Sequence, residues 1–370
     1  DSFRAYDTGE DDPVPAGPVH NGTTRLVDLD PPAGATAALV NLTYDATAGP
    51  GFVRAWAART PRPTTSSLNA DRANTIAANA AVVALAPDGS FVIESATTAR
   101  VVIDVMAWFV ETSGTTDDGR FIALDPTRLV DTRIPAGETL DDGSPNPYTR
   151  SPEQIDIDVL GQLDVPDDDT VAAVVIGVAT IGRSTSAGYV GGHAGGTTWP
   201  GTSNVNVSPS EVRANMLVVP VGGNGGISLR AFQIADVAVD VLGYVTSDDA
   251  GVSGSGLYNT IAPTRSVDTR VPVGASRLGP LASVETDTPA ATAGASAVAQ
   301  NITVTNTAGP GWASAHPGPV APVVSNVNYD GPFHTRAAFA FTTVSSSDSI
   351  YFTSLVATDL VVDVVGFFSD

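Results

Sequence analysis

The chain has 370 residues, with 40 acidic residues against 18 basic ones and a formal net charge of -22 at pH 7. A surface this acidic repels nucleic-acid phosphates and anionic lipid headgroups, so we expect no nucleic-acid partner and no membrane insertion. The chain has no cysteine and every basic residue is arginine, which excludes thiol nucleophiles, thiolate metal sites and lysine-dependent phosphate binding. A saline habitat and GC-rich coding both account for this acidic, lysine-free composition.

The composition favours an all-β fold. With 36 glycines and 27 prolines, and with threonine, valine and alanine abundant, the sequence reads as short strands joined by turns. No apolar run reaches the ~18 residues that a membrane helix needs.

A strand-length apolar segment with one aspartate inside it occurs three times and sets the organisation of the chain. Its copies are VVIDVMAWFV (101–110), VAVDVLGYV (237–245) and LVVDVVGFFSD (360–370), which contain Asp104, Asp240 and Asp363. Each copy is interpreted as a central strand that is buried on both faces. The aspartates are 136 and 123 residues apart, and this period predicts three domains, 1–113, 114–248 and 249–370, joined by polar linkers.

Each repeat opens with the motif Arg-x-x-Asp-Thr. The copies contain Arg4 with Asp7, Arg128 with Asp131, and Arg265 with Asp268. An apolar lead-in strand precedes the motif in the second and third repeats, at 121–124 and 257–262, whereas the sequence begins inside the motif of the first repeat. We therefore expect that further residues precede Asp1 in the precursor.

The middle of each repeat is predicted to form a hairpin. At 37–56, 172–193 and 296–316 the pattern is a strand, a turn rich in glycine, proline or threonine, and a second strand. A Ser-x-x-Asn element and further strands follow, which gives about eight strands per repeat, the number of a two-sheet sandwich. The prediction for the whole chain is three tandem β-sandwich, jelly-roll-like repeat domains.

One departure from the repeat concerns the strand after Ser-x-x-Asn. This strand begins with Asn79 in the first repeat and Asn215 in the second, but the third repeat has Arg336, Ala337 and Ala338 there. A role that needs the asparagine amide is therefore not expected in the third repeat.

Together these motifs resemble a family of repeat modules from secreted and cell-surface proteins of actinobacteria and some other bacteria. The resemblance lies in P-T-R-x-V-D-T-R at 126–133 and 263–270, S-N-V-N at 203–206 and 325–328, and V-V-D-V-V-G-F-F at 361–368. The family consensus is close to P-T-R-L-L-D-T-R, S-N-L-N and I-V-D-V-V-G-Y-F. The resemblance covers nearly the whole chain and implies export and an accessory role. The first repeat departs from the consensus, because Gly9 replaces the second arginine of the motif.

The repeated arginines and aspartates are the only polar constellation in the sequence. A catalytic interpretation makes a pair such as Asp131 and Asp240 the acid and base of a glycoside hydrolase. The interpretation that we favour is structural, because a strand aspartate between valines must be paired inside the fold, most economically with the opening arginine of its repeat. No His-Glu-x-x-His or Gly-x-Ser-x-Gly pattern occurs, so no catalytic residue is predicted and the chain is expected not to be an enzyme.

Two weaker ligand signals remain. Trp199, in the loop GGTTWPG, has no counterpart in the other repeats and could stack on a sugar, although isolated surface aromatics are common. Acidic clusters at 117–118, 141–142 and 167–169 could ligate Ca²⁺, but none follows a Ca²⁺-loop spacing, so no metal site or cofactor is predicted. Solvated loop charge is the preferred interpretation of these clusters.

The expected function is a non-catalytic structural or adhesive role outside the cell, in a cell-surface layer, a filament or a virion appendage. The expected partners are other copies of the chain or other surface proteins. The alternative is a carbohydrate-binding accessory module of a secreted protein, with a glycan as the ligand.

Overall fold

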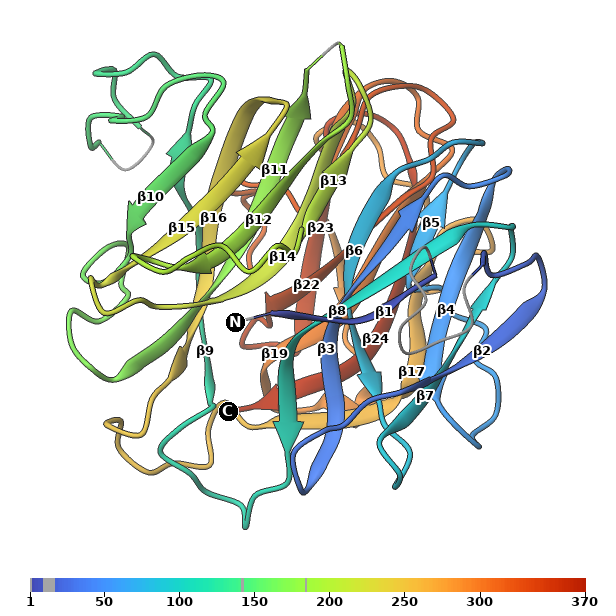
Figure 1. The fold of residues 1–370 in the computed structure, drawn as a ribbon, viewed down its shortest axis with the longest axis horizontal. Helices are drawn as coiled ribbons and strands as arrows, with labels where there is room; N and C mark the ends of the chain where they lie inside the picture. Colours follow the sequence, from blue (N-terminus) through green and yellow to red (C-terminus); the bar gives the residue numbers. More distant parts are fainter. Residues whose placement is uncertain (1, 9–16, 141–142, 184) are drawn as a thin grey trace.

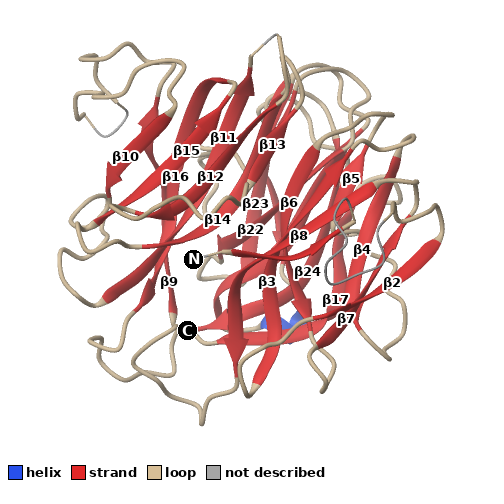
Figure 2. Ribbon diagram, viewed as in Figure 1, coloured by secondary structure: helices blue, strands red, loops and turns tan. Residues whose placement is uncertain are grey.

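The fold is all-β, as the composition predicted (Figure 2). The computed structural model describes residues 2–8, 17–140, 143–183 and 185–370. Among these residues the only helical element is η1, a 3-10 turn at Ala290–Thr292.

Each repeat contributes eight strands in the same order along the chain. The first repeat contains β1 (Phe3–Asp7), β2 (Thr23–Asp28), β3 (Ala35–Asp45), β4 (Gly51–Ala57), β5 (Leu68–Ala70), β6 (Ala77–Ala84), β7 (Ser90–Ser95) and β8 (Arg100–Val110). The second contains β9 (Phe121–Asp131), β10 (Gln154–Asp158), β11 (Val171–Gly182), β12 (Gly188–Ala194), β13 (Val205–Val207), β14 (Val212–Pro220), β15 (Gly226–Phe232) and β16 (Ile234–Thr246). The third contains β17 (Tyr258–Asp268), β18 (Val284–Asp287), β19 (Ala295–Thr305), β20 (Gly311–His316), β21 (Val327–Tyr329), β22 (Arg336–Thr343), β23 (Ser349–Ser354) and β24 (Asp359–Ser369).

The strands of each repeat form two antiparallel four-stranded sheets. One sheet contains the closing strand and is called the inner sheet here; its order is β1-β8-β3-β6, β9-β16-β11-β14 or β17-β24-β19-β22. The other is called the outer sheet, with the order β2-β7-β4-β5, β10-β15-β12-β13 or β18-β23-β20-β21. In each inner sheet the closing strand lies in an interior position, between the opening strand and the third strand of its repeat.

The predicted hairpins do not form. Strands β3 and β4 lie in different sheets, and the same holds for β11 and β12 and for β19 and β20. The turn between them carries the chain from the inner to the outer sheet. A strand-turn-strand pattern does not tell whether the second strand pairs with the first as a hairpin or joins another sheet, because both connections need the same turn residues.

The alternating side chains of the inner sheets belong to two different cores. On β3, Val40 and Leu42 pack against the outer sheet of the same repeat, in a core that includes Phe91 of β7. Leu39 points the other way, into a core that all three repeats share. Because both faces are covered, the inner strands are apolar at nearly every position, as the sequence indicated.

The shared core brings the three repeats together around one centre. It contains Leu39 from the first repeat, Met216 and Val175 from the second, and Phe339 and Phe341 from the third. The six sheets stand around this centre in a six-bladed, propeller-like arrangement (Figure 1). The prediction of three separate sandwiches in tandem is therefore wrong in its arrangement, because the second face of each inner sheet is buried against the other repeats.

Candidate functional site

The motif residues of the second repeat form one buried cluster. Arg128 on β9 lies opposite Asp240 on β16, and its Nε donates a hydrogen bond to the Asp240 carboxylate. Nη1 of Arg128 donates to Asp131 Oδ2 at 2.6 Å, and Nε of Arg133 donates to Asp131 Oδ1 at 2.8 Å. Nη2 of Arg128 reaches across to the third repeat and donates to the carbonyl oxygen of Val323 at 3.0 Å.

The same trio recurs in the other two repeats. Nε of Arg4 donates to Asp104 Oδ1 at 3.0 Å, while Nε and Nη2 of Arg265 donate to the two oxygens of Asp363 at 2.8 and 3.0 Å. In both repeats Nη1 of the arginine donates to the motif aspartate three residues later, at 3.2 Å. The structure thus brings together the nine residues of the predicted polar network, one trio per repeat.

The threonine of each motif holds the end of the opening strand against the closing strand. Its Oγ1 accepts a hydrogen bond from a backbone N–H of the closing strand at 2.9–3.0 Å, and its own N–H donates back to that strand at 2.9–3.2 Å. The donors to Thr8, Thr132 and Thr269 are Val101, Val237 and Leu360. This pairing explains the threonine of the motif.

The two aspartates of a trio have different electrostatic environments. Burial raises the pKa of Asp240, and the neighbouring Arg128 only partly offsets this effect. Burial also acts on Asp131, but its hydrogen bonds with Arg133 and the charge of Arg133 outweigh the burial and lower its pKa. An acid–base pair needs such a difference. In this repeat Arg128 contacts both carboxylates, and the Asp240 side chain is only 3% exposed.

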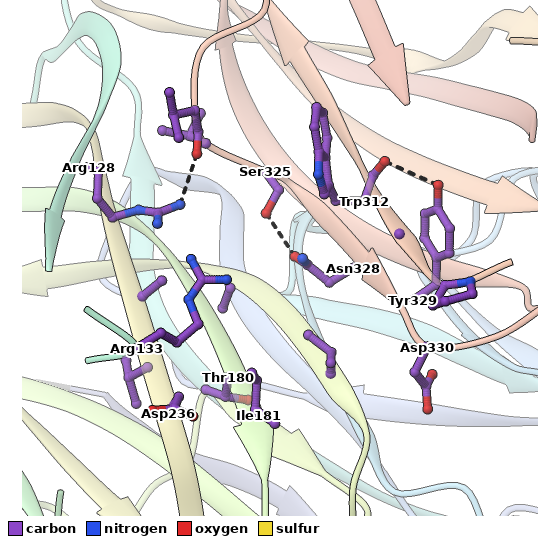
Figure 3. Close-up of a pocket in the computed structure, with 18 residues that line it drawn as sticks. Arg128, Arg133, Thr180, Ile181, Asp236, Trp312, Ser325, Asn328, Tyr329 and Asp330 are labelled. Carbon is purple, nitrogen blue, oxygen red and sulfur yellow. Dashed lines mark hydrogen bonds between the residues drawn. The ribbon is translucent and has the colours of Figure 1, made fainter. Parts of the chain in front are cut away.

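A cavity of about 440 Å³ lies beside this trio, between the second and third repeats (Figure 3). Arg128 and Arg133 lie on one side of it. On the other side are Trp312 and the Ser-x-x-Asn element, in which Ser325 Oγ donates to Asn328 Oδ1 at 3.0 Å.

A corresponding hollow of about 330 Å³ joins the first and second repeats. It is lined by Arg4 and Asp7 from the first repeat and by Ser203 and Asn206 from the second. The opening motif of one repeat therefore faces the Ser-x-x-Asn element of the next repeat.

Asparagine side chains close the junctions near the centre. Asn215 Oδ1 accepts hydrogen bonds from Ala80 N of β6 at 2.8 Å and from Met216 N at 2.9 Å, and its Nδ2 donates to Asn41 Oδ1 at 2.9 Å. These bonds satisfy backbone groups on strands that are sheet edges, where N–H groups otherwise lack partners.

The next junction repeats this pattern. Asn79 Oδ1 accepts from Phe339 N at 2.8 Å, and Asn79 Nδ2 donates to Asn301 Oδ1 at 2.9 Å. The remaining junction, between the second and third repeats, has neither asparagine. Gly177 occupies the position of Asn41 and Asn301, and Ala338 occupies the position of Asn79 and Asn215. The sequence showed the loss of the first asparagine, but only the strand register identifies Gly177 as its lost partner.

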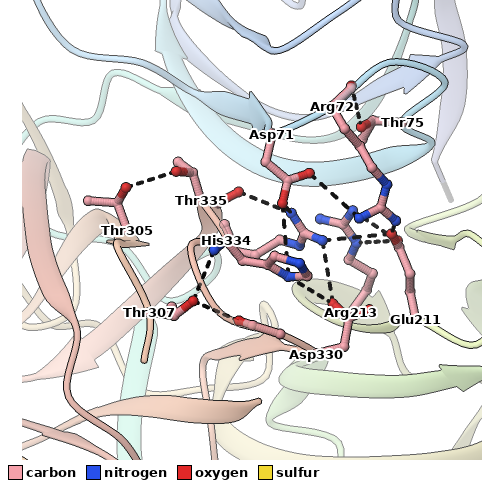
Figure 4. Close-up of polar contacts among 12 residues, drawn as sticks. Asp71, Arg72, Thr75, Glu211, Arg213, Thr305, Thr307, Asp330, His334 and Thr335 are labelled. Carbon is pink, nitrogen blue, oxygen red and sulfur yellow. Dashed lines mark hydrogen bonds and ion pairs between the residues drawn. The ribbon is translucent and has the colours of Figure 1, made fainter. Parts of the chain in front are cut away.

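A charged cluster that the sequence analysis missed lies where loops of all three repeats meet (Figure 4). Arg336 is almost fully buried and pairs with Asp71 of the first repeat and, at 3.4 Å, with Asp330. Arg213 pairs with Glu211 at 2.9 Å in the second repeat. Arg213 and Arg336 occupy equivalent positions in the strand registers of their repeats, and Asp71 and Asp330 both follow the Ser-x-x-Asn element in an Asn-x-Asp sequence. The sequence analysis did not use these recurrences.

Trp199 lies in a row of three aromatic rings on the outer sheet of the second repeat. Its ring stacks on Tyr189 at a centroid distance of 5.6 Å, and Tyr189 stacks on Phe232 at 5.5 Å. The indole Nε1 donates to Thr202 O at 3.0 Å, and Phe232 is 49% exposed. The loop can fold down onto β12 because Gly191 has no Cβ, which would lie 2.4 Å from Thr202 O.

No metal site is found in the part of the chain that the structure describes. No group of three or more histidine, aspartate or glutamate side chains there is arranged to hold a metal ion. The acidic pair at 141–142 lies outside the described residues.

None of the described helical residues forms a segment that could cross a membrane.

The sequence was compared with protein-family models and with curated proteins. No protein-family model matches the sequence, and no curated protein is significantly similar to it.

Proposed function

We propose that this protein is a non-catalytic structural or adhesive protein that works outside the cell as one block of a surface assembly. The assembly would be a cell-surface layer, a filament or a virion appendage, with other copies or other surface proteins as partners. The observation that carries the proposal is that the repeated polar residues bind one another inside the fold. Arg128 binds Asp131 and Asp240 and reaches the next repeat through Val323, and the arginines of the two other trios bind the corresponding aspartates of their own repeats.

We also propose that each repeat is a jelly-roll sandwich and that the chain is a fused trimer of such sandwiches. The support is the strand order: the first strand pairs with the eighth, the third with the sixth and eighth, and the second with the seventh. Each pair of sheets also encloses its own apolar core. A compact three-part block suits a building unit better than a flexible linker.

Salt provides the test of assembly. With a net charge of -22, copies repel one another at low ionic strength, and screening shortens the range of this repulsion from about 30 Å at 0.01 M to about 3 Å at 1 M. We expect ordered oligomers or filaments in light scattering and negative-stain microscopy as salt rises from about 0.05 M to above 1 M. A monomer throughout this range, with and without Ca²⁺, would contradict the proposal.

The aromatic row supports a second candidate function, which is glycan binding. Trp199, Tyr189 and Phe232 lie on one sheet face and leave the outer ring faces at the two ends for a sugar. A glycan array should then give hits that Trp199→Ala and Phe232→Ala abolish. Tyr351→Ala, on the outer sheet of the third repeat, is the matched control and should leave the hits unchanged.

A further inference from the structure

A cavity of about 600 Å³ lies between the first and third repeats, and we call it the junction cavity. The first repeat contributes β4, β6 and the loop 60–67, and the third repeat contributes lead-in residues of β17 and part of its inner sheet. The larger apolar side chains of the lining include Trp56, Pro61, Pro63, Tyr258, Ile261 and Val365. Small-molecule sites usually have volumes of about 300–1,000 Å³ and mostly apolar walls, and the junction cavity has both properties.

The side chains of β6 that line the cavity are smaller than their equivalents in the third repeat. The strand registers place Val82 of β6 at the position of Phe341 of β22. Between the second and third repeats, the Phe341 ring packs on Phe121 of the lead-in strand at a centroid distance of 5.2 Å. Val82 and Tyr258, the equivalents of these two residues, line the junction cavity instead.

The burial of β4 shows the same difference between the two junctions. The pairing of β4 with β5 and of β20 with β21 makes Ala55 the equivalent of Ala315. Ala315 is 2% exposed, whereas Ala55 lines the cavity and is only half-buried. The first repeat therefore leaves open a space that is filled in the third repeat.

The lead-in strand presents a carbonyl group to which no side chain donates. Between the second and third repeats, Thr343 Oγ1 donates to Leu124 O at 3.3 Å. Ile261 is the equivalent of Leu124, but Ala84 occupies the position of Thr343 and has no hydroxyl group. Within the described part of the chain no side chain donates to Ile261 O in place of Thr343. A ligand with a hydrogen-bond donor can supply the missing bond.

The charged groups at the cavity already have partners. Both carboxylate oxygens of Asp363 accept hydrogen bonds from Arg265, at 2.8 and 3.0 Å. Arg62, in the loop 60–67, donates through Nε and Nη2 to the two carboxylate oxygens of Glu94. A charged ligand would lose its hydration here without gaining an unpaired counter-ion, so the site favours an uncharged ligand.

We infer that the junction cavity binds a small, uncharged aromatic molecule that carries a hydrogen-bond donor such as a hydroxyl group. The aromatic ring lies beside Val82 and Tyr258, as the Phe341 ring lies beside Phe121 at the other junction. The donor binds Ile261 O, as the Thr343 hydroxyl binds Leu124 O. This inference goes beyond the proposed structural role and does not depend on it.

Calorimetric titration with 2-naphthol at pH 7 tests the inference. This compound is uncharged at that pH and has one hydroxyl donor, and we expect one molecule to bind per chain with a Kd below about 1 mM. 2-Naphthoate and 2-naphthylmethylamine have the same ring system with a negative and a positive charge. Each should bind at least about tenfold more weakly than 2-naphthol.

Two variants place the bound molecule in the junction cavity. Val82→Phe introduces the side chain of Phe341 and should weaken 2-naphthol binding at least about tenfold. Val218→Phe is the matched control, because residue 218 has the equivalent position on β14 and lies outside the cavity lining, so binding should be unchanged. Ala84→Thr supplies a hydroxyl for Ile261 O at a half-buried position and should weaken binding about tenfold, which decides the test if Val82→Phe fails to fold.

No binding of 2-naphthol to wild-type protein at up to about 1 mM would overturn the inference. Binding that neither variant weakens, or that the two charged compounds match, would overturn it as well. Salt-driven assembly is measured without any of these compounds, so failure of the cavity site leaves the proposed structural role standing.

Discussion

Replacing Asn215 by alanine should destabilise the whole protein and not only the second repeat. Asn215 is 2% exposed and makes four hydrogen bonds, two of which reach Ala80 N and Asn41 of the first repeat. In the Asn215→Ala variant the N–H groups of Ala80 and Met216 lose their acceptor in a buried site. Each buried donor without a partner costs about 1–3 kcal/mol, so the free energy of unfolding should fall by about 2–6 kcal/mol.

Denaturant unfolding followed by tryptophan fluorescence and circular dichroism measures this loss. Trp56, Trp199 and Trp312 report on the first, second and third repeats, and we expect all of them to show the same shifted transition. Asn259→Ala is the control, because this asparagine is exposed and should change stability by less than about 0.5 kcal/mol.

A double-mutant cycle locates the effect at the junction. Asn215→Ala and Asn41→Ala should show a coupling energy of about 0.5–3 kcal/mol, since their side chains bond each other across two repeats. Additive effects, or an Asn215→Ala variant as stable as the Asn259→Ala control, would refute the view that these amides hold the repeats together.

Three further predictions concern the trios, the pH response and the lead-in strands. Asp240→Ala should lower the free energy of unfolding by about 3–5 kcal/mol, because the variant leaves its buried arginine partner unpaired. An unchanged melting temperature in calorimetry would contradict the structural role of the trio. Burial lowers the pKa of His316, whose Nδ1 donates a hydrogen bond to Gly318 O at 2.6 Å. The unfolded chain therefore binds a proton more readily than the folded protein, and the free energy of unfolding should fall as the pH drops below about 6.5. A His316→Gln variant should show a smaller loss between about pH 7 and pH 5, and an identical profile would contradict this cause. Gly366→Ala should lower the free energy of unfolding in urea by about 1–3 kcal/mol, because the new Cβ would overlap the Tyr258 side chain. An unchanged free energy of unfolding would show that the ring can move aside.

The sequence by itself determined the strands of each repeat and the ion-pair partner of each buried aspartate. The period of the three closing segments located the repeats, and alternating apolar runs located eight strands in each. An aspartate such as Asp363, surrounded by valines, needed a partner, and Arg265 was the recurring candidate that the structure places beside it. These features depend on local periodicity and on the cost of burying a lone charge, and both can be read from one chain.

Only the tertiary structure decided which sheets meet and what fills the space between them. The segment around Leu39 and Val40 is apolar whether its second face packs on a helix, on a second copy or on another repeat, so the sequence left the shared centre undetermined. Strand pairing was equally open, because the turn between β3 and β4 suits a hairpin and a crossing between sheets alike. The meeting of Arg336 with Asp71 depends on the closure of three repeats around one centre, and a contact between residues 265 positions apart leaves no periodic signal in the chain.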